Sequence, residues 1–314
     1  MPSDKLWGMT HDPARPFGRL LTAMVTPFLP DGSLNVDGAQ KLAAYLVDVQ
    51  RNDALVISGT GGESPTTTDA EKDVLLRAVV EAIGDRAQIV AGVGTNNTAH
   101  TIELARAAEK AGAHGLLVVT PYYNKPPQAG LLRHFRAVAD VTGLPALLYD
   151  IPHRAGVPIA TDTLIRLAEH PNIVGVKDAK GDLAATSDVL RRTDLAYYSG
   201  EDAATLPMLA IGAVGIVGTS THFAGAPTKE LIEAFERGDV AGALALHRRL
   251  LPIYTGIFRT QGSILVKAGL NRMGLPAGPV RSPLVDATEA ETHQLIEDAA
   301  AAGLTLDTTA KDTA

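Results

Sequence analysis

The sequence predicts an α/β protein, a (β/α)8 TIM barrel with a C-terminal helical extension. Eight short apolar segments recur along the chain, and their starts lie about 28 residues apart, which is the size of a repeating βα unit. The segments are almost continuously apolar, as expected of parallel strands buried on both faces. The glycine-rich fingerprint that often follows the first strand of an open, doubly wound sheet is missing, which favours the closed barrel.

The candidate strands alternate with helices in the order that a barrel requires. The strands cover residues 20–27, 54–58, 88–93, 115–120, 145–150, 173–177, 196–199 and 215–217. Between them lie amphipathic helices such as 69–83 and 98–111. In the second of these, Ile102, Ala105 and Ala108 recur at helical spacing, with charged residues on the other faces.

The pattern divides the chain into four parts. These are an N-terminal extension at 1–18, the barrel at 19–224, a helical region at 225–303 and a disordered tail at 304–314. The helical region contains three candidate helices, at 239–258, 263–273 and 288–302. We expect it to pack on the barrel and to serve assembly or rigidity. No linker separates the barrel from it.

Composition excludes several classes of protein. The 46% hydrophobic and 20% charged residues are ordinary for a globular enzyme, and the net charge of −7 argues against a nucleic-acid partner. No cysteine is present, and the nine histidines form no metal-binding motif, so we expect neither a metal nor an organic cofactor. The chain has no apolar run that could span a membrane and no secretory signal at 1–16, so we expect a cytoplasmic protein.

Lys177 is the most informative candidate for chemistry. It closes the apolar run 173–176, and in a barrel the functional end is the carboxyl end of the strands. An ammonium group at that mouth is poorly solvated, which lowers its pKa and favours the nucleophilic amine that forms Schiff bases. The alternative is a surface lysine paired with Asp178 or Asp182.

Other strand ends carry further candidates. Tyr149 follows two leucines, and a buried phenol near an amine can move protons, although a core tyrosine fits the same pattern. Thr60 lies in a glycine-rich turn, where the backbone N–H groups of Gly61 and Gly62 could bind a carboxylate; a plain turn is the alternative. Arg154 could hold a carboxylate in a bidentate pair or be an ordinary loop arginine.

Together these segments resemble the dihydrodipicolinate synthase / N-acetylneuraminate lyase family of pyruvate-dependent barrels. The resemblance covers roughly residues 19–303. The matching motifs are Gly59-Thr60-x-Gly62-Glu63, Thr120-Pro121-Tyr122-Tyr123, Tyr149-Asp150-Ile151-Pro152-x-Arg154-x-Gly156 and Gly175-Val176-Lys177-Asp178. Four matches in the same order, each at a strand end, make a chance origin improbable.

The resemblance implies a role for each site residue. Lys177 forms the Schiff base with pyruvate, Tyr149 is the general acid/base, and Thr60 links it to Tyr123, which is donated across a tight dimer interface. The implied substrate-binding positions are Gly61, Gly62, Arg154, Gly200 and Val217. The imine acts as the electron sink, so neither metal nor cofactor is needed.

The family also implies a substrate pair and an assembly. Arg154 favours the synthase branch, which condenses pyruvate with L-aspartate 4-semialdehyde on the route to diaminopimelate and lysine. The implied assembly is a homotetramer built from two tight dimers. For the assembly contacts, the sequence offers the apolar segments 209–211 and 250–258.

Some positions depart from the synthase pattern. Gly61 replaces a second threonine, Glu201 stands where aspartate is usual, and the loop 218–222 partly resembles the lyase branch. An aldolase for another 4-hydroxy-2-keto acid is therefore the alternative, followed by a non-catalytic barrel that binds a keto acid. Asp69, Lys72 and His100 replace residues of the lysine site of sensitive synthases. We therefore expect weak or absent inhibition by lysine.

Overall fold

The computed structural model describes residues 14–306. Eight parallel strands close a barrel in chain order, with β1 bonded to both β2 and β8. The strands are β1 (Leu20–Ala23), β2 (Ala54–Ile57), β3 (Gln88–Gly92), β4 (Gly115–Val119), β5 (Ala146–Asp150), β6 (Ile173–Asp178), β7 (Ala196–Ser199) and β8 (Gly215–Gly218). The predicted TIM barrel is confirmed. The predicted terminal segments lie mostly outside the described residues, at 1–13 and 307–314.

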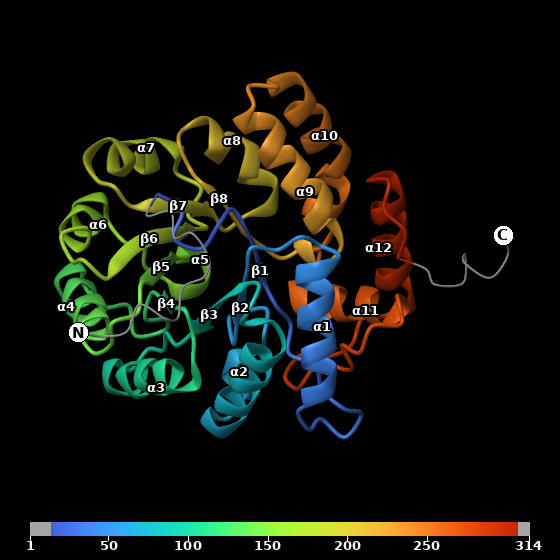
Figure 1. Ribbon diagram of the computed structural model, residues 1–314, viewed down its shortest axis with the longest axis horizontal. Coiled ribbons are helices and arrows are strands. Elements are labelled where there is room, and N and C mark those ends of the chain that lie inside the picture. The colour runs from blue at the N-terminus through green and yellow to red at the C-terminus, as the bar shows by residue number, and fades with distance from the viewer. Residues whose placement is uncertain (1–13, 307–314) are drawn as a thin grey trace, which may run out of the picture.

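Helices follow each strand and surround the barrel (Figure 1). They are α1 (Val36–Asp48), α2 (Asp69–Ile83), α3 (Thr98–Ala111), α4 (Gln128–Ala139), α5 (Pro152–Ala155), α6 (Thr161–Leu167), α7 (Leu183–Arg192), α8 (Thr205–Ala210) and α9 (Thr221–Glu236). Short 3-10 turns lie at Ser64–Thr66 and Asp202–Ala204. Within residues 14–306, no helix is both long enough and apolar enough to cross a membrane.

The three predicted C-terminal helices are present as α10 (Val240–Gly256), α11 (Gly262–Arg272) and α12 (Glu289–Ala301). They gather on one side of the barrel, where α10 contacts α9 and α12, and α12 contacts α11 (Figure 1). The boundary expected at 224/225 falls inside α9, at a kink where Ala224 leaves helical geometry. Pro227 lies one turn further on and cannot donate a backbone hydrogen bond.

Side-chain caps explain where several helices begin. Thr68 and Glu71 form a reciprocal capping box at α2, and Thr288 and Glu291 form a second at α12. Each box satisfies backbone N–H groups that have no partner within the helix. At the start of α3, the Asn97 side chain accepts two backbone N–H groups.

The first strand is shorter than its apolar run predicted. We expected it to reach residue 27, and it ends at Ala23. The Met24 N–H still donates to the Val56 carbonyl of β2, but the pairing ends there. Val25 N donates to the His222 ring at the start of α9, and Thr26 Oγ1 donates to the Gly62 carbonyl in the loop after β2. Pro27 has no N–H to continue a ladder.

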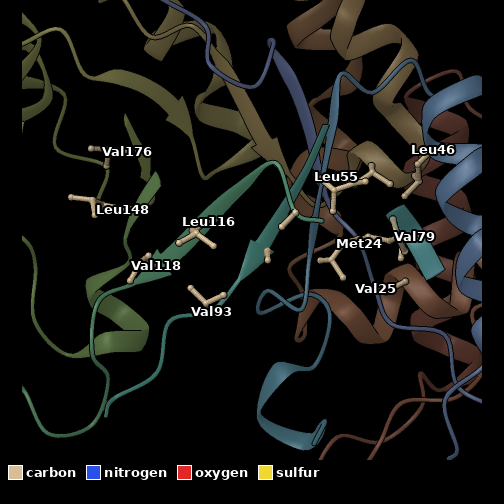
Figure 2. Packing of buried hydrophobic residues seen from close by; sticks show 14 of the residues in the cluster. Met24, Val25, Leu46, Leu55, Val79, Val93, Leu116, Val118, Leu148 and Val176 are labelled. Carbon is tan, nitrogen blue, oxygen red and sulfur yellow. The ribbon is translucent and has the colours of Figure 1, made fainter. Parts of the chain in front are cut away.

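Apolar side chains fill two layers of the barrel. The outer layer lies between strands and helices, as Figure 2 shows for Leu55, Leu116, Leu148, Val176, Leu46 and Val79. The inner layer fills the barrel itself and includes Tyr149 and Tyr198. Because side chains alternate along a strand, Val176 faces the helices while its neighbour Lys177 faces the barrel axis.

Candidate active site

Lys177 and Tyr149 form the centre of the site, at the carboxyl end of the barrel. The two residues are direct partners in the β5–β6 ladder, and each side chain is 5% exposed. The Lys177 Nζ lies 4.2 Å from the centre of the Tyr149 ring. Two buried polar groups on adjacent strands are therefore in contact at the mouth, as the sequence predicted.

The alternative interpretation of Lys177 as a paired surface lysine is wrong. Asp178 faces the helices, where its carboxylate accepts hydrogen bonds from Thr186 Oγ1 and the Lys180 backbone. Asp182 caps α7 by accepting from the Ala185 backbone N–H. Both carboxylates are thus engaged elsewhere, and Lys177 is buried.

Burial controls the protonation of the central pair. It lowers the pKa of Lys177 to about 8, while the Asp202 and Glu201 carboxylates oppose that shift and Arg154 adds to it. At pH 7 about a tenth of such an amine is unprotonated and nucleophilic. Burial also raises the pKa of the Tyr149 phenol, partly offset by Arg154 and by a hydrogen bond with Thr60. Tyr149 therefore keeps its proton at neutral pH and can donate it.

A cavity of about 250 Å³ opens onto the Lys177 amine. Four of the predicted residues line it together with Lys177 and Tyr149, namely Thr60, Gly61, Arg154 and Gly200. The remaining lining residues are Ala23, Ile151, His153, Glu201, Thr219, Phe258, Thr260, Gln261, Gly262 and Ser263. Within residues 14–306, no group of three or more metal-ligating side chains is present.

A second cavity, of about 410 Å³, lies beside the first. The two share Thr60, Tyr149, Ile151 and Arg154, and the second is also lined by Tyr123. The Tyr123 side chain is 88% exposed, and its backbone has a φ of 73°, a conformation uncommon outside glycine. The structure thus brings Tyr123 to the rim of the neighbouring cavity, and Thr60 and Tyr149 line both cavities together.

Two of the predicted substrate-binding positions do not line the Lys177 cavity. The Gly62 N–H donates to the Gly59 carbonyl at 3.1 Å, so the turn itself uses the donor that we expected to bind a carboxylate. Val217 is fully buried among the apolar residues inside the barrel. A turn bond occupies the Gly62 N–H and packing occupies the Val217 side chain, so neither position faces the cavity, and substrate binding by these two residues stays a prediction.

One wall of the cavity was not predicted from the sequence. Five of its lining residues belong to the segment 258–263, which covers the connection after α10 and the first two residues of α11. Ser263 Oγ donates to the Gly61 carbonyl at 2.8 Å and so connects this wall to the loop after β2. We expected the helical region to serve assembly or rigidity. The one available signal was a polar run, residues 260–263, between two apolar helices.

A buried carboxylate accepts hydrogen bonds from the loop after β8, the loop that departs from the synthase pattern. Asp202 is 1% exposed and accepts hydrogen bonds from the backbone of Thr219, and from both the backbone and the hydroxyl of Ser220. His222 Nε2 accepts from Val25 N, and its Nδ1 lies 2.8 Å from the Thr219 carbonyl. Burial lowers the pKa of His222 to about 4, so the ring is neutral and joins this loop to the end of β1.

The chain is similar to characterised families and structures over nearly its whole length. The sequence profile of the Dihydrodipicolinate synthetase family matches residues 16–302. A 4-hydroxy-tetrahydrodipicolinate synthase of Acidothermus cellulolyticus is 70% identical over 290 residues, which are 92% of this chain and 94% of that protein.

Solved structures agree with this match. A dihydrodipicolinate synthase of Cyanidioschyzon merolae with lysine bound is 41% identical, with a TM-score of 0.89, covering 91% of this chain and 98% of that one. A dihydrodipicolinate synthase of Acinetobacter baumannii, described as chloride-inhibited and complexed with pyruvate, is 34% identical with a TM-score of 0.87. This match covers 92% of this chain and 99% of the Acinetobacter chain.

Proposed function

We propose, because this chain belongs to the dihydrodipicolinate synthetase family, that it catalyses the reaction of a 4-hydroxy-tetrahydrodipicolinate synthase. In this reaction pyruvate condenses with L-aspartate 4-semialdehyde, a step toward diaminopimelate and lysine. One observation carries the proposal: a buried lysine with a lowered pKa lies against a buried tyrosine at the mouth of the barrel, facing a cavity.

The geometry supports a sequence of steps on the chain's own side chains. The unprotonated Lys177 amine attacks the keto carbon of pyruvate, and loss of water leaves an imine. Tyr149 supplies the proton for the departing oxygen, since its raised pKa keeps it protonated. Removal of a methyl proton then gives an enamine, which attacks the aldehyde. The amine of the aldehyde substrate finally displaces Lys177, closing the ring and restoring the free lysine.

Arg154 supports the choice of an aldehyde that carries a carboxylate. Its side chain is exposed, and it lines both cavities beside Tyr149. A guanidinium in that position presents a planar pair of donors, which suits bidentate binding of a carboxylate. Gly61 and Gly200 complete the proposed binding surface on the Lys177 side.

We propose that Tyr123 acts across a subunit interface. Its exposed position at the rim of the second cavity is compatible with donation to a neighbouring subunit, as in a tight dimer within a homotetramer. A monomeric variant is known for one dihydrodipicolinate synthase that is 34% identical. Sedimentation of this protein tests the assembly, and a monomer that turns over at full rate would exclude a role for Tyr123 across an interface. We also propose a cytoplasmic location, in line with the acidic composition.

The function is tested by borohydride trapping. The intact protein is reduced in the presence of pyruvate and weighed by mass spectrometry, and turnover with L-aspartate 4-semialdehyde is followed in a coupled assay. We expect one reduced pyruvyl group on Lys177, none on Lys177→Met, and an unchanged adduct on Lys41→Met, which alters an exposed lysine of α1. An adduct without turnover would refute the aldehyde assignment, and no adduct at all would refute the imine mechanism.

A further inference from the structure

One face of α11 contacts the loop after β2 at two points. Ser263 and Lys267 lie one helical turn apart, so their side chains project to the same side. Ser263 Oγ donates to the Gly61 carbonyl, and the Lys267 ammonium forms an ion pair with Glu63 at 2.6 Å. The loop held in this way carries Thr60 and Gly61, which line the Lys177 cavity.

The ion pair between Glu63 and Lys267 is almost fully enclosed. The side chains are 1% and 2% exposed, and neither residue lines the Lys177 cavity. The second carboxylate oxygen of Glu63 accepts the backbone N–H of Arg281 at 2.8 Å. Lys267 also donates to the Pro279 carbonyl at 2.7 Å and lies 4.2 Å above the Phe28 ring. Each charge thus has partners beyond the pair itself.

Glu63 also has an unfavourable backbone conformation. Its φ is 55° and its ψ is 38°, in the left-handed region that residues with a Cβ seldom occupy. Its N–H donates to the Thr60 carbonyl at 3.2 Å, which closes the turn on which Thr60 lies. Such a conformation persists only where surrounding contacts determine it. Here those contacts come from α11 and from the segment before α12.

We propose that Glu63 and Lys267 are positioning residues for the reaction. Their ion pair holds the loop after β2 so that Thr60 and Gly61 stay in place on the wall of the Lys177 cavity. The inference rests on the proposed function. Buried ion pairs commonly contribute little net stability, because desolvation of two charges offsets their attraction. A buried ion pair can instead specify one conformation, and here that conformation is the one of the loop on the cavity wall. The C-terminal helices thereby become part of the site.

The experiment removes the tether without leaving a charge buried alone. The double variant Glu63→Gln/Lys267→Met keeps the side-chain lengths, and the amide oxygen of the introduced glutamine can still accept the Arg281 N–H. We expect a thermal midpoint close to that of the parent, a raised KM for pyruvate, a lowered kcat and a loss in kcat/KM on the order of 10²-fold, typical of a misplaced contact. A folded double variant with parental KM and kcat would overturn the proposal.

A matched control separates positioning from general destabilisation. Lys229→Met removes a lysine from the ion pair with Asp53, at the opposite, amino-terminal end of the barrel. We expect its kcat and KM to match the parent at temperatures where it is folded. A loss of kcat/KM as large as that of the double variant would contradict a specific role for Glu63 and Lys267.

Two further arms keep the test decisive. If the double variant does not fold, Glu63→Asp retains the charge but shortens the tether by one methylene. We expect Glu63→Asp to raise the KM for pyruvate several-fold, and an unchanged KM would overturn the proposal. The parent protein is assayed in parallel: absence of a pyruvate adduct in the parent would refute the proposed function, whereas an active parent with an equally active double variant would refute this inference alone.

Discussion

Gly61 is the position where the structure makes the sharpest prediction. A Cβ at this residue would lie 2.8 Å from the Ala23 carbonyl oxygen at the end of β1, closer than side-chain carbons approach backbone oxygens. The obstacle is backbone rather than a flexible side chain, so the loop itself has to move. Overpacking of this kind costs roughly 1–3 kcal/mol. Gly61→Ala should therefore lower the free energy of unfolding by about that amount, and the shifted loop should raise the KM for pyruvate.

Gly61→Thr adds a hydroxyl as well as the contact with Ala23. One hydrogen bond from that hydroxyl to the pyruvate carboxylate would contribute roughly 1.5–3 kcal/mol, which is similar in size to the steric cost. The threonine variant alone therefore cannot separate the two effects. The difference between Gly61→Thr and Gly61→Ala isolates the hydroxyl, and we expect threonine to bind pyruvate more tightly than alanine by about tenfold or more.

The assay is steady-state kinetics with pyruvate varied, together with thermal unfolding. Gly143→Ala is the matched control, because a Cβ there meets nothing within 4 Å and should leave both measurements unchanged. Parental KM and stability in Gly61→Ala would refute the close approach to Ala23. Equal KM values for the alanine and threonine variants would refute the contribution of a hydroxyl.

Three other predictions follow from protonation and charge. Because the pKa of Lys177 is about 8, the rate of imine formation should rise about tenfold per pH unit below 8 and level off above it; a rate independent of pH through 8 would contradict this. Burial raises the pKa of Asp150 from 3.8 to about 6, so the folded state holds this proton more tightly than the unfolded state does. The resulting contribution to the free energy of unfolding is fully present below pH 3.8 and is lost as the pH rises through 6. Asp150→Asn should therefore raise the free energy of unfolding at pH 8, by at most about 3 kcal/mol, and equal destabilisation at pH 5 and 8 would count against it. Lysine should inhibit weakly or not at all, because Asp69 is already 2.8 Å from the His100 ring and Lys72 donates to the Thr67 carbonyl; half-inhibition at sub-millimolar lysine would disprove this.

The barrel was predictable because its signal is local and repeated. Apolar runs such as 115–119 recur at the spacing of a βα unit, and each needs only its own composition to be recognised as a buried strand. Lys177 and Tyr149 were predictable for the same reason, since each ends such a run. The end of β1 was not, because it depends on Val25 bonding to His222, a residue far along the chain.

The substrate-binding positions show where local patterns stop being sufficient. Gly61 and Gly62 are adjacent in one glycine-rich turn, and no local rule says which of them faces the cavity. The structure decides: Gly61 lines the wall, while the N–H of Gly62 closes the turn onto Gly59. The outcome depends on the packing of this loop against β1 and α11.

The sequence alone predicted the strand order, the lysine at a buried strand end and the family resemblance. Each of these features depends on residues that are neighbours along the chain. The wall formed by 258–263 and the ion pair of Glu63 with Lys267 were not predicted, since both join segments about 200 residues apart. Their partners are chosen by how the helical region packs on the barrel. Contacts of that kind leave no periodic pattern in either segment, so only the closed tertiary structure reveals them.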